Sequence, residues 1–153
     1  MNQLRRVFLW MRNSLVPPHR LDEHAQLQVV NLTRQTSLAT NLEVAGSGPK
    51  RAKGLLGRKG LGPGQGMWIV PCEAVHTIGM QFPIDLVYLD RRHRVKKVRS
   101  SVPPWRLSAC LSAHSVIELA SGAIRESRTG VGDVLEFSPV PEPDNDTSPA
   151  DQA

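Results

Sequence analysis

The sequence predicts a mainly β (α+β) fold, a small barrel-like or curled β-sheet domain with two short helices. Two observations support this prediction. Short apolar runs of strand length recur along the chain, and glycine or proline separates most of them. The chain of 153 residues also fits one domain, since domains are typically about 100–150 residues long. Hydrophobic residues make up 40% of it and charged residues 22%, as in ordinary globular proteins.

Three regions divide the chain. Residues 26–138 form the predicted single β-rich domain, and residues 1–25 precede it as an arm. The apolar residues of this arm recur at helical spacing: Leu4, Val7, Phe8 and Met11. We expect this amphipathic helix to pack on the domain, and peripheral membrane contact by residues 1–15 is the alternative. Residues 139–153 are rich in proline and acids, which predicts a disordered tail.

At the start of the domain the pattern predicts two strands, a helix and a loop. The strands are residues 27–31 and 38–44. Pro49 is typical of a first helical position, so a helix is predicted over residues 50–56, and Gly57 would end it. Every second residue from Gly60 to Gly66 is glycine, which predicts a loop. The spacing of these glycines does not match a phosphate-binding loop.

The second half of the domain has the densest strand signals. Residues 84–89 are apolar apart from one acid, which predicts a strand buried on both faces. Residues 90–93 turn the chain into a second strand over residues 94–102, so the pair is a predicted hairpin that two prolines end. A short helix is predicted over residues 123–128. The other predicted strands are residues 67–70, 75–80, 115–119 and 134–137.

The apolar runs also bear on the compartment. None approaches the roughly 20 residues that span a bilayer. The apolar run that follows Arg5 and Arg6 ends at Arg12, which makes it shorter than the core of a signal peptide. We therefore expect a cytoplasmic protein without a transmembrane segment. An exported protein is the alternative if translation begins elsewhere.

Five short blocks, in one order and spacing, resemble a known family. They are Gly54-Leu55-Leu56-Gly57-Arg58, Gly66-Met67, Met80 with Pro83-Ile84-Asp85 and Leu89-Asp90, Ile117-Glu118-Leu119 with Gly122, and Gly132-Asp133. The pattern is similar to that of the bacterial and archaeal family catalogued as domain of unknown function 192. The resemblance covers about residues 27–137. It implies a compact, β-rich single domain, and it implies no activity because the family has none assigned.

Two cysteines and two histidines repeat one spacing. They are Cys72 with His76, and Cys110 with His114. Such a set is sufficient for tetrahedral zinc, with Glu73 or Asp85 as a replacement ligand, although the usual close cysteine pair is absent. A disulfide is a second alternative and requires an oxidising compartment. We favour two buried cysteines that pack as small apolar side chains beside partly exposed histidines, so no cofactor is expected.

A catalytic interpretation uses the first of these pairs. If His76 and Asp85 faced one cleft, Asp85 would orient the imidazole and Cys72 would act as a thiolate nucleophile. Cys–His dyads generally arise from distant positions, so this local pair is weak evidence. The alternative is that Asp85, Glu118 and Asp133 hydrogen-bond to backbone N–H groups at turns and strand ends. We favour this structural role, and a non-enzymatic protein over an enzyme.

The predicted hairpin concentrates the basic residues of a chain with a net charge of +5. They are Arg91, Arg92, Arg94, Lys96, Lys97 and Arg99, and Trp105 lies nearby in sequence. Bases beside an aromatic ring bind the phosphates of nucleic acid and stack on a base. Bases on an exposed edge strand also prevent edge-to-edge aggregation, and we favour that interpretation. Weak polyanion binding is therefore an alternative, and nucleic acid is not the expected partner.

From these observations we expect a non-catalytic ligand-binding, protein-binding or accessory module. Its partner would be an unidentified small molecule or protein, bound at a face beside the glycine-rich loop. The predicted ligand-binding residues are Gly66, Trp68, His76, Met80 and Asp85. The glycines leave backbone N–H groups accessible, and Trp68 and Met80 supply an apolar wall. A metal- or thiol-dependent enzyme that uses the two Cys–His pairs is the alternative.

Overall fold

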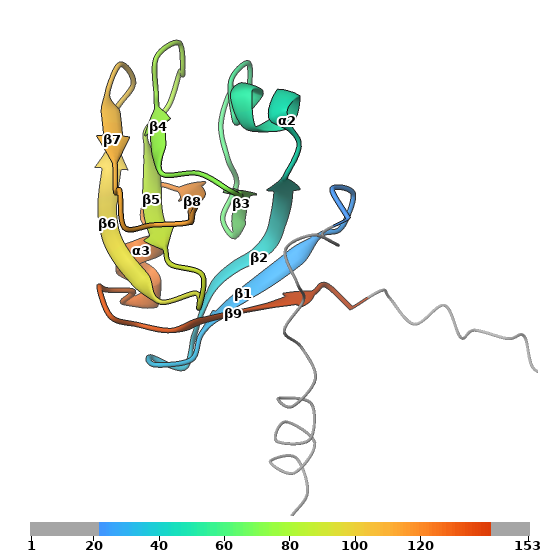
Figure 1. Cartoon of the computed structure of the whole chain (residues 1–153), viewed down its shortest axis with the longest axis vertical. Coiled ribbons are helices and arrows are strands. Elements are labelled where there is room, and N and C mark those ends of the chain that lie inside the picture. Colours follow the sequence, from blue (N-terminus) through green and yellow to red (C-terminus); the bar gives the residue numbers. More distant parts are fainter. Residues whose placement is uncertain (1–21, 142–153) are drawn as a thin grey trace, which may run out of the picture.

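A seven-stranded sheet curls into a partly closed barrel (Figure 1). The computed structural model describes residues 22–141. The strands of the sheet are β1 (Leu27–Asn31), β2 (Thr36–Ala45), β3 (Gln65–Ile69), β5 (Ile84–Leu89), β6 (Val95–Val102), β8 (Ser115–Ala120) and β9 (Leu135–Pro139). Their order is β6-β5-β8-β3-β2-β1-β9, in which β2 and β3 run parallel and the other neighbours antiparallel. The predicted mainly β, curled-sheet fold is confirmed.

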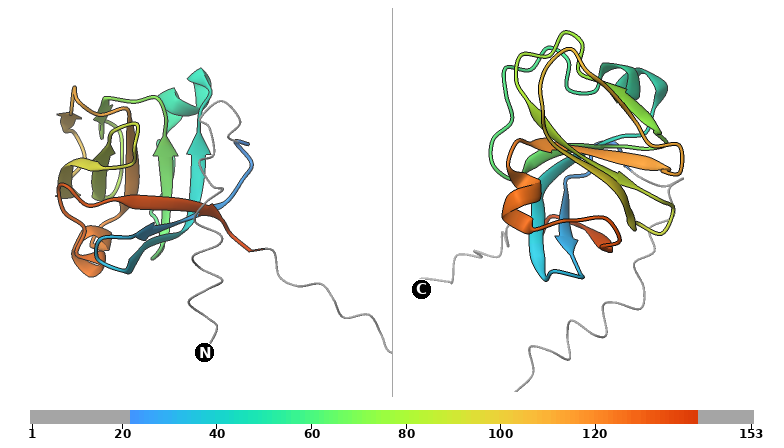
Figure 2. Two further views of the ribbon diagram at one scale, coloured as in Figure 1. Left: turned by 60° about the horizontal axis from the view of Figure 1, so that its bottom comes forward. Right: turned by 90° about the vertical axis from the view of Figure 1, so that its left-hand side faces the viewer.

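The two outermost strands of the sheet meet at one end of the barrel. An isolated bridge pairs Arg94 with Val134. Beside it, the amide of Val95 donates to the carbonyl of Asp133 at 2.8 Å, and the amide of Leu135 donates to the carbonyl of His93 at 3.0 Å. These bonds close the barrel between β6 and β9 at this end, and Figure 2 shows the resulting curl of the sheet.

Alternate residues of the central strands face two different hydrophobic cores. The inner core fills the barrel and includes Trp68, Val87, Ile117, Leu119 and Phe137. The outer core lies on the opposite face and includes Ile69, Met80, Leu86, Tyr88 and Val116. All six residues of β5 are therefore buried, which explains why its sequence reads as one continuous apolar run.

Short elements cover the outer core. A two-stranded ribbon of β4 (Ala74–His76) and β7 (Leu107–Ala109) lies over it, together with the helix α2 (Gly48–Lys53) and the loop that follows. The second helix, α3 (Ala123–Ser127), lies at the other end of the barrel (Figure 1). No helix within residues 22–141 is long and apolar enough to cross a membrane.

Several element boundaries differ from the predictions. Helix α2 ends at Lys53 because Gly54 adopts a φ of 49° and its N–H bonds to the carbonyl of Lys50 at 2.9 Å, so the predicted stop at Gly57 is wrong. Strand β4 has three residues instead of the predicted 75–80, and β7 was not predicted. The predicted helix within residues 1–15 and the tail from residue 142 lie outside the described residues.

Asp85 anchors the end of the barrel where α3 begins. It is fully buried on β5, and its carboxylate accepts hydrogen bonds from the amides of Ser101 at 2.8 Å, Gly122 at 3.1 Å and Ile124 at 2.9 Å. The N-cap residue of α3 is glycine and has no side chain to cap the helix, so Asp85 supplies the acceptor from a neighbouring strand. The predicted bonding of Asp85 to backbone N–H groups is confirmed, and the donors lie in β6 and at the start of α3.

Asp133 has a similar role where β1 meets the turn before β9. Its carboxylate accepts hydrogen bonds from Asn31 Nδ2 at 2.9 Å, from the amide of Gly130 at 2.9 Å and from Arg34 Nε at 3.1 Å. Burial alone would raise the pKa of Asp133, but the hydrogen bonds from Asn31, Arg34 and Gly130 and the charge of Arg34 together outweigh it and lower the pKa. This carboxylate therefore has a structural role in joining segments about a hundred residues apart in sequence.

Thr77 fixes the ribbon that covers the outer core. Its buried hydroxyl donates to the carbonyl of Pro103 at 2.8 Å and accepts from the amide of Arg106 at 2.9 Å. Its backbone N–H bonds to the carbonyl of Arg106 at 2.9 Å, and its carbonyl accepts from the amide of Trp105 at 3.0 Å. Thr77 thereby holds the loop between β6 and β7, in which Trp105 has a φ of 64°.

Thr77→Val, which keeps the shape of the side chain and removes the hydroxyl, is expected to destabilise the domain by about 1–2 kcal/mol because both hydroxyl bonds are lost. Urea denaturation followed by circular dichroism measures this change. Thr77→Ser, which keeps the hydroxyl, is the control and should lose less stability. Equal stability of Thr77→Val and the wild type would show that the hydroxyl does not fix the ribbon.

Candidate functional site

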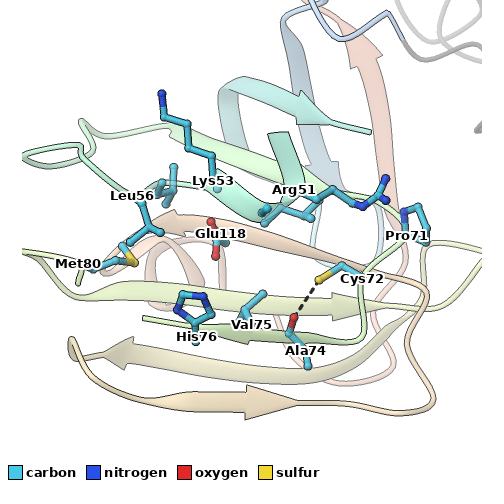
Figure 3. Close-up of a pocket in the computed structure, with 14 residues that line it drawn as sticks. Arg51, Lys53, Leu56, Pro71, Cys72, Ala74, Val75, His76, Met80 and Glu118 are labelled. Carbon is cyan, nitrogen blue, oxygen red and sulfur yellow. Dashed lines mark hydrogen bonds between the residues drawn. The ribbon is translucent and has the colours of Figure 1, made fainter. Parts of the chain in front are cut away.

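A cavity of about 300 Å³ lies over the outer face of the sheet, between α2 with its following loop and strand β4. The end of β3 and the residues after it form a third side, and Glu118 of β8 lies at its floor (Figure 3). This volume is at the lower end of the roughly 300–1,000 Å³ that is typical of small-molecule sites. The cavity therefore has the size of a site for a small ligand.

Apolar side chains make about half of the walls. They are Leu55, Leu56, Ile69, Val75 and Met80. Ile69 reaches the cavity because it lies on the outer face of β3, and Leu55 reaches it because the chain turns inward after α2 ends at Gly54. These contacts give the cavity an apolar middle around one acidic group.

Glu118 is the unusual residue of the cavity. It lies on β8 opposite Met67 of β3 and Leu86 of β5, and it is only 3% exposed. Its Oε2 atom is buried and has no hydrogen-bond partner among the described residues. A Cβ atom at Gly54 would lie 3.5 Å from this oxygen, so a glycine there keeps a side chain from packing against the carboxyl. Burial raises the pKa of Glu118 from 4.5 to about 7, and the charge of Arg58 partly opposes this rise.

Arg58 is the nearest candidate partner for Glu118, but it bonds elsewhere. Its Nη1 and Nη2 atoms each donate to a carboxylate oxygen of Glu43 at 2.8 Å. These bonds lower the pKa of Glu43, and they hold the guanidinium in a two-pronged pair outside the cavity lining. Arg58 therefore influences Glu118 through its charge and leaves the carboxyl oxygen Oε2 unsatisfied.

The mouth of the cavity is basic. Arg51 and Lys53 of α2 line it on one side and His76 of β4 on the other, and Glu118 is the one acid in the lining. Figure 3 shows the Lys53 side chain extending away from the floor and the Arg51 side chain running toward Pro71. One guanidinium nitrogen of Arg51 donates to the carbonyl of Gly46. The charges thus separate along the cavity, with the carboxyl below and the bases above.

The Cys72 thiol also lines the cavity. It donates to the carbonyl of Ala74 at 3.1 Å, and burial raises the pKa of the thiol. A thiol with a raised pKa is a poor nucleophile at neutral pH because little of it is thiolate. Cys110 lies outside this lining, where its sulfur is 3.5 Å from the Ser112 hydroxyl. Both cysteines are free thiols, so the disulfide alternative is not formed in the structure.

The four predicted zinc ligands do not gather. Backbone hydrogen bonds do place the two segments side by side, from Cys72 to the carbonyl of His114 and from Cys110 to the carbonyl of Glu73. The side chains diverge, however, because His76 lines the cavity above Glu118 and His114 lines a separate one. Within residues 22–141 there is no group of three or more histidine, cysteine or acidic side chains arranged to hold a metal ion.

Of the predicted ligand-binding residues, the structure brings His76 and Met80 to the cavity and leaves the others outside it. Trp68 faces the inner core, where its ring stacks on Phe137 at 4.2 Å between centroids. Asp85 pairs with Leu119 of the inner core, so His76 and Asp85 do not share a cleft. Gly66 is needed for packing, since a Cβ there would clash with the carbonyl oxygen of Glu118.

The predicted polyanion bases lie on β6, at the edge of the sheet, and in the turn before it, and Trp105 lies in the loop after it. Two of them have structural contacts. Lys97 Nζ donates to the carbonyl of Ala109 at 2.7 Å and lies 5.8 Å from the centre of the Tyr88 ring, and Arg94 donates to the carbonyl of Gly132 at 2.9 Å. This edge position fits the role of bases that discourage pairing with another sheet.

Comparison with known proteins places the chain in a family. The model of the family described as DUF192, uncharacterized ACR, matches residues 29–137. The chain belongs to this family. The resemblance seen in the five sequence blocks is thereby confirmed. In this DUF192 domain three of those blocks meet at the cavity, namely 54–58, Met80 and 117–119, although only some residues of each line it.

Two solved structures share the fold of this DUF192 domain. One is described as a candidate transcription regulator from Sinorhizobium meliloti; it is 18% identical, has a TM-score of 0.66, and the match covers 74% of this chain and 92% of that one. The other is a protein of unknown function from Novosphingobium aromaticivorans, 20% identical, with a TM-score of 0.63 and a match over 72% and 83% of the two chains. At these identities the likeness establishes the fold alone. No curated protein matches the chain.

Proposed function

We propose that this DUF192 domain is a non-catalytic binding module, whose ligand is a small molecule that enters the cavity and donates a hydrogen bond to Glu118. The observation that carries the proposal is the buried Oε2 atom of Glu118, which has no partner among the described residues and borders the cavity. A buried acceptor without a partner costs about 1–3 kcal/mol. A ligand that supplies the missing donor recovers that cost on binding.

The contents of the cavity support binding over catalysis. The pKa of the Cys72 thiol is raised by burial, and the hydrogen bond of this thiol goes to a backbone carbonyl. Asp85, the group that was to orient His76, lies in the other core. The catalytic arrangement considered from the sequence thus loses its activated nucleophile and its orienting acid, while the apolar walls and the single acceptor remain.

The test is a ligand screen followed by amide chemical shifts in two-dimensional NMR. The probes are a panel of small primary amines, alcohols, amides and amino acids, each tested with the full chain. We expect at least one class to shift amides that border the cavity, such as those of Gly54, Leu55 and Val75. Glu118→Gln, in which the acceptor is altered at constant shape, should weaken that binding.

Glu136→Gln is the matched control. It makes the same substitution on β9, at a carboxylate that lies outside the cavity lining. It should bind as the wild type does. A cavity-filling variant, Leu55→Trp, should abolish the shifts without removing any polar group. The proposal fails if no class of probe shifts these amides, or if the shifts persist unchanged in Glu118→Gln and Leu55→Trp.

A further inference from the structure

The charges of the cavity are ordered along its depth. Glu118, at its floor, is 3% exposed, whereas Lys53 and His76 at its rim are exposed and Arg51 is half-buried. The stretch between them is lined by aliphatic and thioether side chains, chiefly those of Leu55, Val75 and Met80. A complementary molecule therefore carries a positive group at its leading end, an apolar middle and a negative group at its trailing end.

An ammonium group suits the floor better than a neutral donor does. Glu118 is 3% exposed, so its carboxylate has lost most of its hydration. A positively charged partner compensates this buried negative charge, which a neutral donor does not. The bases of this region do not supply that partner. Arg58 is paired with Glu43, and the Lys53 side chain extends away from the floor (Figure 3).

The rim then disfavours a simple cation. A molecule with only an ammonium group would pass two permanent positive charges, on Arg51 and Lys53, and would leave them without a counter-charge. A carboxylate at its trailing end turns the same residues into attractive contacts. Arg51 has one guanidinium nitrogen bonded to the carbonyl of Gly46, which holds the side chain at the rim.

We propose that the ligand is a small zwitterion of the ω-amino-acid type, with its two charges at opposite ends of an aliphatic chain. It places its ammonium group on Glu118, the chain against Leu55, Val75 and Met80, and its carboxylate at Arg51 and Lys53. This inference rests on the proposed function of the same cavity. It adds the chemical class of the ligand and the direction in which the ligand enters.

The ionisation of Glu118 gives the proposal a distinctive pH dependence. The titratable or charged side chains around it are Arg51, Lys53, Arg58, Cys72, His76 and Tyr88. Because an ammonium group requires the carboxylate form, binding releases the proton that Glu118 holds at lower pH. Affinity should then fall about tenfold per pH unit below pH 7 and level off above it, which follows from the pKa of about 7 for Glu118.

The experiment uses three probes of one length: 5-aminopentanoate, pentylamine, in which a methyl group replaces the carboxylate, and hexanoate, in which a methyl group replaces the ammonium group. Each is titrated into the full chain by calorimetry and NMR between pH 5 and pH 8. We expect 5-aminopentanoate to bind about tenfold more tightly than the amine and hexanoate to bind least. Glu118→Gln should weaken 5-aminopentanoate binding by about a hundredfold.

A further variant isolates the contribution of the rim. Arg51→Met with Lys53→Met should remove the advantage of 5-aminopentanoate over the amine. The zwitterion proposal is overturned if hexanoate binds as tightly as 5-aminopentanoate, or if 5-aminopentanoate binding does not change between pH 5 and pH 7. If 5-aminopentanoate and the amine fail while alcohols or amides still shift the cavity amides, the zwitterion is wrong and the proposed function stands.

Discussion

Asp85→Ala is expected to destabilise the domain by about 4 kcal/mol, because three backbone N–H groups lose one fully buried acceptor at once. The donors are the amides of Ser101, Gly122 and Ile124. They come from β6 and from the start of α3, so the loss loosens the contact between the sheet and the helix that covers one end of the barrel. Urea denaturation followed by circular dichroism measures the free energy of unfolding directly.

Two controls show whether burial causes this effect. Asp90→Ala removes a carboxylate that also accepts two backbone hydrogen bonds, from Arg92 at 2.8 Å and Arg94 at 3.0 Å, but at an exposed turn where water can replace it. It should cost about 1 kcal/mol or less. Asp85→Asn keeps one acceptor oxygen, so its loss of stability should lie between those of the two alanine variants. An unchanged melting temperature of Asp85→Ala, together with lost ligand binding, would contradict the structural role and move Asp85 to the functional residues.

Glu118→Gln is expected to stabilise the ligand-free domain at pH 8. Burial raises the pKa of Glu118 from 4.5 to about 7, so the folded protein holds a proton that the unfolded chain releases between these two values. The contribution of Glu118 to stability therefore falls as the pH rises from 4.5, and it levels off above pH 7. Over this window the loss amounts to about 3 kcal/mol, since one pKa unit corresponds to about 1.36 kcal/mol.

The measurement compares the wild type with Glu118→Gln by urea denaturation at pH 5, 6, 7 and 8. The difference between the two proteins removes the contributions of other titrating groups, such as His93 and His114, whose pKa values burial lowers. We expect the free energy of unfolding of the variant, relative to that of the wild type, to increase at each step up to pH 7 and to change little beyond it. A difference that stays constant from pH 5 to pH 8 would show that Glu118 is not the buried acid described above.

The strands that the sequence predicts best are those whose pattern and flanking turns agree. The bounds predicted for residues 27–31 and 84–89 are those found in the structure, because large apolar residues dominate both runs. Helix α2 was extended too far because Gly54 and Gly57 are both able to end a helix, and the sequence does not show which adopts the capping conformation. Strand β7 was missed because three residues with an exposed, buried, exposed pattern carry too little periodicity.

The candidate site was only partly predictable for a related reason. In a strand buried on both faces, every side chain is either apolar or hydrogen-bonded. Apolar and polar residues then do not alternate along the sequence, so the pattern does not indicate which core a side chain enters. Trp68 and Asp85 were therefore assigned to the face of His76, although they belong to the inner core. The sequence shows Glu118 as an acid in an apolar strand, and this pattern predicts an acceptor for backbone N–H groups, which the structure contradicts. The signal that distinguishes it, the missing partner of its carboxyl oxygen, exists only in three dimensions.

The pairing of the first strand with the last has a consequence for how the domain folds. β1 bonds to β9 from Leu27–Pro139 to Asn31–Leu135, and Asn31 bonds to Asp133 across 102 positions. Contacts of such sequence separation slow folding, because the loop entropy is lost before the contact is gained. During synthesis β1 has no partner on this side until β9 has left the ribosome. Until then its free edge is open to pairing with other chains, and this is the interval in which the nascent domain most needs protection from aggregation.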